Sequence, residues 1–244
     1  MTSVLDHLSI ATPALTDGWD LFGGVLGGSW AYGGDSPGFW WGQLGFEAGP
    51  KIELMKPDGG PDAAFLERFL TSRGPGPHHF NFIVRDIRAT LARVRAHGIE
   101  PVGVDLDHPH WKEAFLHPRD VHGIVVQVAQ QDGDPGGRAP AELPEPGRPA
   151  SFDLIEHHVV DLNRAIRLYR DVLDGQLGSS GEQAAELTWP GGKRIRLVRE
   201  EGLPLGGALH HVRFTRDGAG FSPAERDRAA LLGKRLGLTV ELAG

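Results

Sequence analysis

Residues 5–11, LDHLSIA, and residues 78–84, HHFNFIV, decide the fold of this chain. Both stretches alternate polar and apolar side chains, which is the period of a β-strand with one buried face. A segment with helical spacing and a glycine stop follows each strand: residues 15–28, LTDGWDLFGGVLGG, and residues 86–98, DIRATLARVRAHG. The sequence therefore predicts the same strand–helix order twice.

Further strands complete both units. Residues 39–47, FWWGQLGFE, and residues 51–57, KIELMKP, extend the first unit, and residues 113–118, EAFLHP, and 123–130, GIVVQVAQ, extend the second. Another strand is expected directly after each helix, at residues 99–104 in the second unit. Each unit is therefore predicted to have the order β-α-β-β-β.

The second half of the chain repeats this pattern. Residues 153–175 align without a gap with the first predicted strand and helix, at an offset of 147 positions. Residues 209–218 are similar to the start of the second unit, and residues 231–244 to its helix and the strand after it. The predicted fold class is α+β: tandem βαβββ modules form half-barrel sheets with helices on the convex faces, and the last module is incomplete.

A proline-rich and glycine-rich strip separates the two halves. Residues 131–150, QDGDPGGRAPAELPEPGRPA, contain five prolines and four glycines, which predicts a linker without helix or strand. We therefore expect a first domain at 1–130 with two units, the linker at 131–150, and a degenerate second domain at 151–244.

Composition limits the classes of function. The net charge of −7 argues against nucleic acid or an anionic membrane as the main partner. No apolar run approaches the length of a membrane span and no secretory signal is present, so we expect a cytoplasmic location. The chain has no cysteine, so a metal site must use histidine, carboxylate or amide ligands.

Four strands each place one ligand-type side chain on the face opposite their bulky apolar residues. A lone histidine or glutamate on a strand is ordinarily a surface or hydrogen-bonded residue. Here such residues recur at equivalent strands of two successive units, which favours a metal site in the concave face of a curved sheet. The predicted ligands are His7, Glu53, His79 and Gln127.

LDHLSIA, KIELMKP, FLERFLTSRGPGPHHFNFIVRDI and AFLHPRDVHGIVVQV resemble the vicinal-oxygen-chelate superfamily of glyoxalases, bleomycin-resistance proteins and extradiol dioxygenases. The similarity is greatest to its methylmalonyl-CoA epimerase-like members. In this family the first and last strands of paired βαβββ units supply the metal ligands. The resemblance implies that the metal ligands of this chain are His7, Glu53, His79 and Gln127. The chain departs from it at Gln127, where the metal enzymes usually have glutamate.

The corresponding positions of the second half differ. Leu154 stands in the place of His7, and Arg196 stands in the place of Glu53, while His211 corresponds to His79. An arginine would repel a cation, so we expect no metal bound in this way there. His157 and His158 are out of register with His7, and the second half is expected to have a structural, partner-binding or substrate-gating role.

Two imidazoles, one carboxylate and one amide oxygen suit one divalent ion of zinc, nickel, cobalt, manganese or iron. Such a centre polarises a carbonyl and eases removal of a proton from the neighbouring carbon. The leading hypothesis is an enzyme of the epimerase, isomerase or lyase type acting on a small carbonyl or thioester substrate. Glu53 would be both ligand and catalytic base, and no other cofactor is expected.

Two other functions are compatible with the sequence. Two histidines and one carboxylate also resemble a non-haem iron triad, which allows extradiol-type dioxygenase chemistry. A non-catalytic protein that binds a drug or metabolite, as bleomycin-resistance members do, is the third hypothesis. Family members often pair units between chains, so a homodimer is also considered, although the tandem copy can supply that partner internally.

Overall fold

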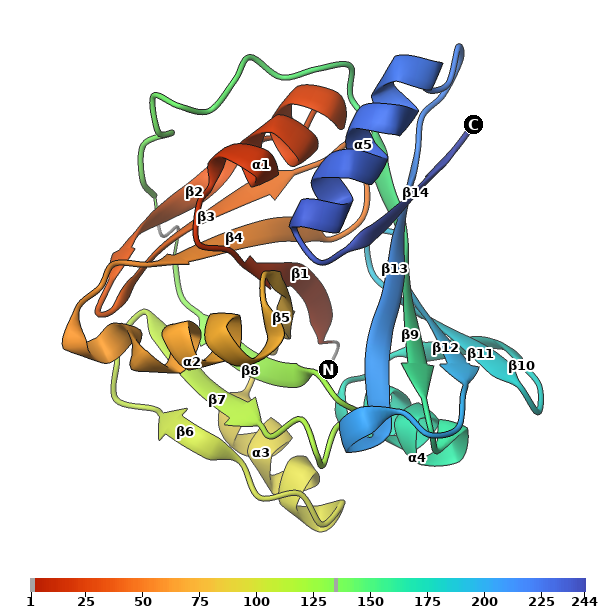
Figure 1. The fold of residues 1–244 in the computed structure, drawn as a ribbon. Helices are drawn as coiled ribbons and strands as arrows, with labels where there is room; N and C mark the ends of the chain where they lie inside the picture. Colours follow the sequence, from red (N-terminus) through yellow and green to blue (C-terminus); the bar gives the residue numbers. More distant parts are fainter. Residues whose placement is uncertain (1–2, 134–135) are drawn as a thin grey trace. The chain divides into compact units, whose positions relative to one another are not determined.

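The computed structural model describes residues 3–133 and 136–244 and contains two mixed β-sheets in that part of the chain. One has eight strands in the order β2-β3-β4-β1-β5-β8-β7-β6, and the other has six in the order β10-β11-β12-β9-β13-β14. Figure 1 shows these strands as arrows with their helices. The predicted α+β class with tandem βαβββ modules is confirmed.

The elements of the first half follow the predicted order. Its strands are β1 Val4–Ala11, β2 Ser29–Ser36, β3 Phe39–Gly45, β4 Lys51–Pro57, β5 Gly76–Ile83, β6 Val102–Asp105, β7 Trp111–Leu116 and β8 Val125–Gln131. Its helical segments are α1 Thr16–Gly18, η1 Trp19–Val25, η2 Pro61–Ala63, α2 Ala64–Arg73 and α3 Ile87–Ala96.

The second half contains fewer strands. They are β9 Ser151–Val159, β10 Gln176–Ser180, β11 Ala184–Trp189, β12 Lys193–Arg199, β13 Gly207–Thr215 and β14 Thr239–Ala243. Its helical segments are α4 Leu162–Arg167, η3 Leu168–Val172, η4 Pro204–Gly206 and α5 Pro223–Arg235.

The repeat at an offset of 147 extends to single hydrogen bonds. In the first module the α1 helix widens into the π-helix η1, and the Leu26 N–H donates to the Leu21 carbonyl at 3.0 Å. In the third module α4 widens into η3, and the Leu173 N–H donates to the Leu168 carbonyl at 3.2 Å. Bonds of this i to i−5 kind are rare in proteins. Their recurrence at equivalent residues supports a common origin of the two modules.

Helix α2 was not predicted as a separate element. It lies between β4 and β5, where the sequence pattern indicates only the end of one module and the start of the next. Its Leu66 side chain is buried with Ala11 and Met55, and Phe69 packs against the same cluster. The helix thus joins the two modules by covering an apolar surface.

The last module is incomplete as predicted, because within the described residues one strand follows α5. The sequence pattern matched residues 239–243 to the strand directly after the helix of the second unit, but β14 takes the place of the last strand of that unit. Strand β14 pairs with β13 in parallel, with Arg213 opposite Glu241, just as β8 pairs with β5, with Asn81 opposite Gln127. Without the two intervening strands β13 would end the sheet, and β14 satisfies its backbone groups instead.

The chain divides into two compact units that each combine modules from both halves. One comprises Met1–His7, His79–Asp134 and Leu154–His210, so it joins the second and third modules. Inside it, the Phe82 ring packs at 5.4 Å from the Trp189 ring. The domain boundaries drawn at the proline-rich strip therefore stay a prediction.

The other unit comprises Leu8–His78, Pro135–Asp153 and His211–Gly244 and joins the first and fourth modules. Inside it, helix α5 lies alongside α1 and η1 (Figure 1). Arg228 pairs with Asp20 at 2.8 Å across these helices.

Beyond Gln131, which ends β8, the described part of the proline-rich strip has no helix or strand, as expected for a linker. It packs on the first module: the Trp30 indole N–H donates to the Gly137 carbonyl at 3.1 Å. Gly137 has a φ of +103°, and a Cβ there would lie 2.0 Å from the Gly33 carbonyl oxygen. Asp134 and Pro135 lie outside the described residues.

None of the helices in the described ranges combines the length and the apolar character needed to cross a membrane.

Candidate metal centre

Neighbouring strands of the eight-stranded sheet carry the four predicted ligands. Their order is β4, β1, β5 and β8, which bear Glu53, His7, His79 and Gln127 respectively. All four side chains are buried. Their apolar sequence neighbours are buried as well: Leu8, Ile52, Leu54, Phe80, Val126 and Val128. The alternation that predicted these faces is therefore present, but both faces are closed to solvent.

Three of the predicted ligands converge. His7, Glu53 and His79 each offer one ligand atom, and these atoms all lie within 4.8 Å of one another. The rings of His7 and His79 lie 5.7 Å apart in an edge-to-face arrangement. Two imidazoles and a buried carboxylate around one point match the donor set of zinc and related divalent ions, whose ligands lie about 2.0–2.2 Å from the metal. The residues present therefore fit a divalent cation.

A carboxylate fixes the orientation of His7. The Nδ1 atom of His7 lies 2.8 Å from Oδ2 of the buried Asp6. When Nδ1 donates this hydrogen bond, Nε2 is left in the form that binds a metal. Strand parity places residues 6 and 7 on opposite faces, so the sequence pattern did not indicate this contact.

Two donors hold the Glu53 carboxylate. The Ser9 hydroxyl donates to Oε1 at 2.6 Å, and the Gln43 amide donates to Oε2 at 2.8 Å. Gln43 stands directly opposite Glu53 in the β3–β4 register. Both oxygens thus have a fixed direction, which a ligand or proton acceptor requires.

Gln127 belongs to a polar chain that crosses β5, β8 and β7. Its Oε1 accepts from the Asn81 amide at 2.7 Å, and its own amide donates to Oε2 of Glu113 at 2.7 Å. An amide oxygen has two lone pairs, so binding a metal would use the one that Asn81 leaves. Its role as fourth ligand stays a prediction.

Glu113 is a second carboxylate in this region that the sequence interpretation missed. Besides Gln127, the Trp111 indole N–H donates to Glu113 Oε2, at 2.7 Å. The signal was present in WKEAFL, because Ala114 and Leu116 are buried on one face and Glu113 therefore points to the other. The apolar pattern indicates the strand, and the pairing of β7 with β8 is what brings Glu113 next to Gln127.

The second sheet has a different set of polar residues. Leu154 is buried, and Arg196 lies 3.7 Å from a carboxylate oxygen of Glu156. His211 Nε2 lies 3.0 Å from Glu241 Oε2. The absence of a metal at Leu154, Arg196 and His211 stays a prediction.

His157 has a structural role. It is fully buried, its Nε2 donates to the His122 carbonyl at 2.7 Å, and its Nδ1 accepts from the Tyr169 hydroxyl at 3.2 Å. Burial lowers the pKa of His157 to about 3, so the ring is neutral at neutral pH.

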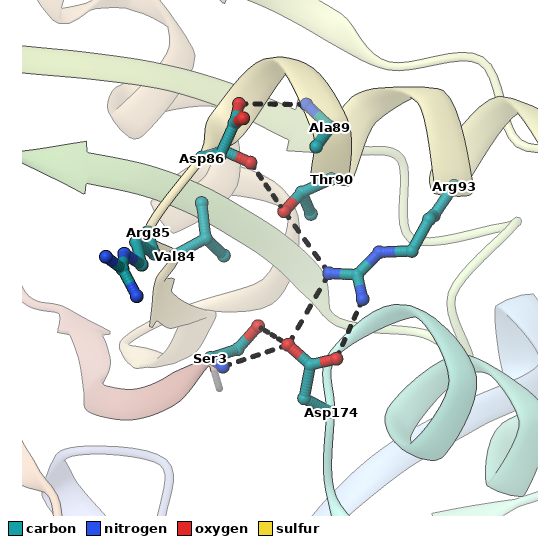
Figure 2. A pocket seen from close by; sticks show the side chains of 8 residues that line it. All are labelled: Ser3, Val84, Arg85, Asp86, Ala89, Thr90, Arg93 and Asp174. Atoms are coloured by element: carbon teal, nitrogen blue, oxygen red, sulfur yellow. Dashed lines mark hydrogen bonds and ion pairs between the residues drawn. The ribbon is translucent and has the colours of Figure 1, made fainter. Parts of the chain in front are cut away.

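A separate cavity of about 260 Å³ lies at the start of α3. Figure 2 shows its lining residues: Ser3, Val84, Arg85, Asp86, Ala89, Thr90, Arg93 and Asp174. The Arg93 guanidinium and Ser3 both donate to Asp174, and these bonds lower the pKa of Asp174 against the opposing effect of burial. None of the predicted metal ligands lines this cavity, so it is not the predicted site.

Comparison with known proteins agrees with this architecture. A model of the glyoxalase/bleomycin resistance protein/dioxygenase superfamily matches residues 6–115. Methylmalonyl-CoA epimerase of Dictyostelium discoideum is 30% identical over 132 residues, which cover 52% of this chain and 78% of that protein. Ethylmalonyl-CoA/methylmalonyl-CoA epimerase of Cereibacter sphaeroides is 36% identical over 85 residues, 33% of this chain and 61% of the relative.

A solved structure extends the similarity to nearly the whole chain. A variant of 4-hydroxymandelate synthase from Streptomyces coelicolor superposes with a TM-score of 0.61 at 14% identity, covering 96% of this chain and 75% of that one. At this identity the match concerns the fold alone.

Proposed function

Because this chain belongs to the glyoxalase/bleomycin resistance protein/dioxygenase superfamily, we propose that it is a divalent-metal-dependent enzyme that transfers a proton at a carbon next to a carbonyl. The reaction would be an epimerisation, an isomerisation or a related lyase reaction on a small carbonyl or thioester compound. The observation that carries the proposal is the convergence of His7, Glu53 and His79 within 4.8 Å.

His7, Glu53 and His79 would hold the metal, with Gln127 as a fourth ligand. When bound, the metal supplies a Lewis acid that polarises the substrate carbonyl and stabilises negative charge on its oxygen. Asp6 keeps His7 in the required tautomer through the 2.8 Å contact to Nδ1. The buried surroundings exclude water and strengthen each of these electrostatic interactions.

Glu53 is the proposed proton acceptor. Ser9 and Gln43 fix its two oxygens, so the carboxylate meets a substrate in one orientation. A carboxylate positioned in this way contributes about 10²- to 10⁴-fold to the rate of proton transfer. Glu113, joined to Gln127 by a hydrogen bond, is a second carboxylate on the other side of β5 in the strand order.

The names of the two relatives make methylmalonyl-CoA the first compound to test. The experiment is exchange of its α-hydrogen for deuterium in D₂O, followed by NMR with purified, metal-loaded protein. Wild-type protein should catalyse exchange, and Glu53→Gln should slow it by about 100-fold or more, because the variant cannot accept the proton.

Glu67→Gln is the matched control, because Glu67 is an exposed glutamate on α2. It should exchange at the wild-type rate. Full exchange activity in Glu53→Gln would remove the catalytic assignment. Oxygen consumption with strict dependence on ferrous iron, without α-hydrogen exchange, would contradict the proton-transfer proposal and favour dioxygenase chemistry.

A further inference from the structure

The cavity at the start of α3 is a second candidate binding site, distinct from the metal centre. Its lining residues all belong to the compact unit formed by the second and third modules. Its volume of about 260 Å³ is below the roughly 300–1,000 Å³ of sites for drug-sized ligands. A ligand that fits this cavity is therefore a small molecule.

The equivalent positions of the other compact unit hold an ion pair. Arg216 directly follows β13, as Val84 follows β5. Glu225 is the third residue of α5, as Ala89 is of α3. The buried Arg216 guanidinium donates to Oε1 of Glu225 at 2.6 Å and to the Val25 carbonyl at 2.8 Å. Val84 and Ala89 are too short to make such contacts, and both line the cavity instead.

One ion pair of the cavity is already satisfied. The Arg93 guanidinium donates to Oδ1 of Asp174 at 2.7 Å, and the N–H and hydroxyl of Ser3 donate to Oδ2 at 3.0 and 2.8 Å. Figure 2 shows this group on one side of the cavity. Both carboxylate oxygens of Asp174 have partners, so a cationic ligand would have to displace Arg93 from it.

Arg85 supplies a positive charge at the opening of the cavity. It is an exposed lining residue, and it forms no hydrogen bond or ion pair with the residues that the structure describes. The neighbouring Asp86 carboxylate caps α3 by accepting from the Ala89 N–H at 3.0 Å. Figure 2 shows this carboxylate at the first turn of α3, away from the Arg85 guanidinium. A guanidinium binds a carboxylate through two parallel N–H donors, so Arg85 favours a carboxylate ligand.

We propose that the cavity binds a short aliphatic carboxylate such as butyrate. Arg85 holds the carboxylate at the opening, and the aliphatic chain lies against Val84, Ala89 and the methyl group of Thr90. Burial of the chain contributes affinity, because each methylene group removed from water improves binding by about fourfold. The site depends on neither the proposed reaction nor the metal centre.

The test is titration of the isotope-labelled full chain with sodium butyrate, followed by NMR. The amide signals of Ala89 and Thr90 should shift and saturate, which separates this site from any carboxylate bound at the metal centre. Affinity should fall by about fourfold for each methylene group removed, from butyrate to propionate to acetate. Inorganic phosphate has no apolar chain, so equal or tighter binding of phosphate would contradict the proposal.

Arg85→Gln should weaken butyrate binding by about 10- to 100-fold, because it removes a charged hydrogen-bond donor. Arg88→Gln is the matched control and should bind like the wild type, since Arg88 is an exposed arginine of α3 outside the lining. Ala89→Leu should abolish binding by filling the cavity, and leucine at this exposed helical position keeps the fold. Unshifted signals in the wild type, or wild-type affinity in Arg85→Gln or Ala89→Leu, would overturn the proposal.

Discussion

The two sheets share one strand order but differ in the polar residues at equivalent points. The order β3-β4-β1-β5-β8 in the first corresponds to β11-β12-β9-β13-β14 in the second. Glu53 opposite Gln43 becomes Arg196 opposite Glu186, and Gln127 opposite Asn81 becomes Glu241 opposite Arg213. Glu53 and Asn81 of the first sheet thus correspond to arginines in the second.

The apolar faces, in contrast, are retained. Phe80 and Phe82 of β5 are fully buried, and so are Val212 and Phe214 of β13. Burial of apolar surface drives folding and is indifferent to the residues on the opposite face. The fold of both sheets is therefore preserved by apolar residues, while a few polar residues decide whether the proposed metal centre can form.

The largest expected effect comes from placing arginine at position 53, as the second sheet has at the equivalent Arg196. Glu53→Arg should abolish binding of the first metal and lower α-hydrogen exchange by about 10²- to 10⁴-fold, because it replaces a ligand and base with a cation. Elemental analysis and NMR exchange measure the two losses. The reverse result, a metal-loaded and active Glu53→Arg protein, would show that the difference between the sheets has no functional meaning.

His157 offers the next largest effect, on stability. His157→Ala leaves the His122 carbonyl and the Tyr169 hydroxyl without their buried partner and opens a cavity, so unfolding free energy should fall by roughly 3 kcal/mol. Urea denaturation followed by circular dichroism provides the measurement. His97→Ala, at an exposed position, should change stability by no more than about 0.5 kcal/mol.

Acid should weaken the same region. Burial lowers the pKa of His157 to about 3 and that of His122 to about 4, whereas both groups titrate near 6.5 when unfolded. The unfolded chain therefore binds protons first, so the stability these groups contribute is complete above pH 6.5 and declines as pH falls toward 4. At pH 5.5, protonation of each of these two histidines in the unfolded chain should lower the free energy of unfolding by about 1.4 kcal/mol relative to pH 8. Unfolding free energies that stay constant over this range would contradict the assignment.

The smallest expected effect is that of replacing Asp6, the carboxylate that contacts His7. Asp6→Asn should weaken binding of the first metal by about 10- to 100-fold, because an amide orients His7 less strongly than a carboxylate. Asp153, which stands at the equivalent position and pairs with Arg213 at 2.6 Å, gives the matched control. Asp153→Asn should leave metal affinity unchanged, and equal losses in both variants would mean that Asp6 acts only through stability.

Two sequence patterns, the alternation of side chains along strands and the internal repeat, predicted the modules and the faces that carry the candidate ligands. Alternation around His7, Glu53 and His79 specified the face of each strand, and the offset of 147 specified that modules recur. These patterns depend on period alone, so they are readable without contacts.

Other features depend on contacts between distant residues. The partnership of Glu113 with Gln127 requires knowing that β7 and β8 are neighbours. The place of β14 beside β13 depends on an edge that exists because two strands are missing. The assembly of each compact unit from modules of both halves leaves no trace in local periodicity.

The most direct test is the metal content of the purified protein after loading with a divalent metal. The wild-type chain should contain one divalent ion, and the His7→Ala and His79→Ala variants should each contain none. Anomalous scattering should place that ion between the His7 and His79 rings. A chain that stays free of metal after loading, or keeps its metal without both histidines, would contradict the account.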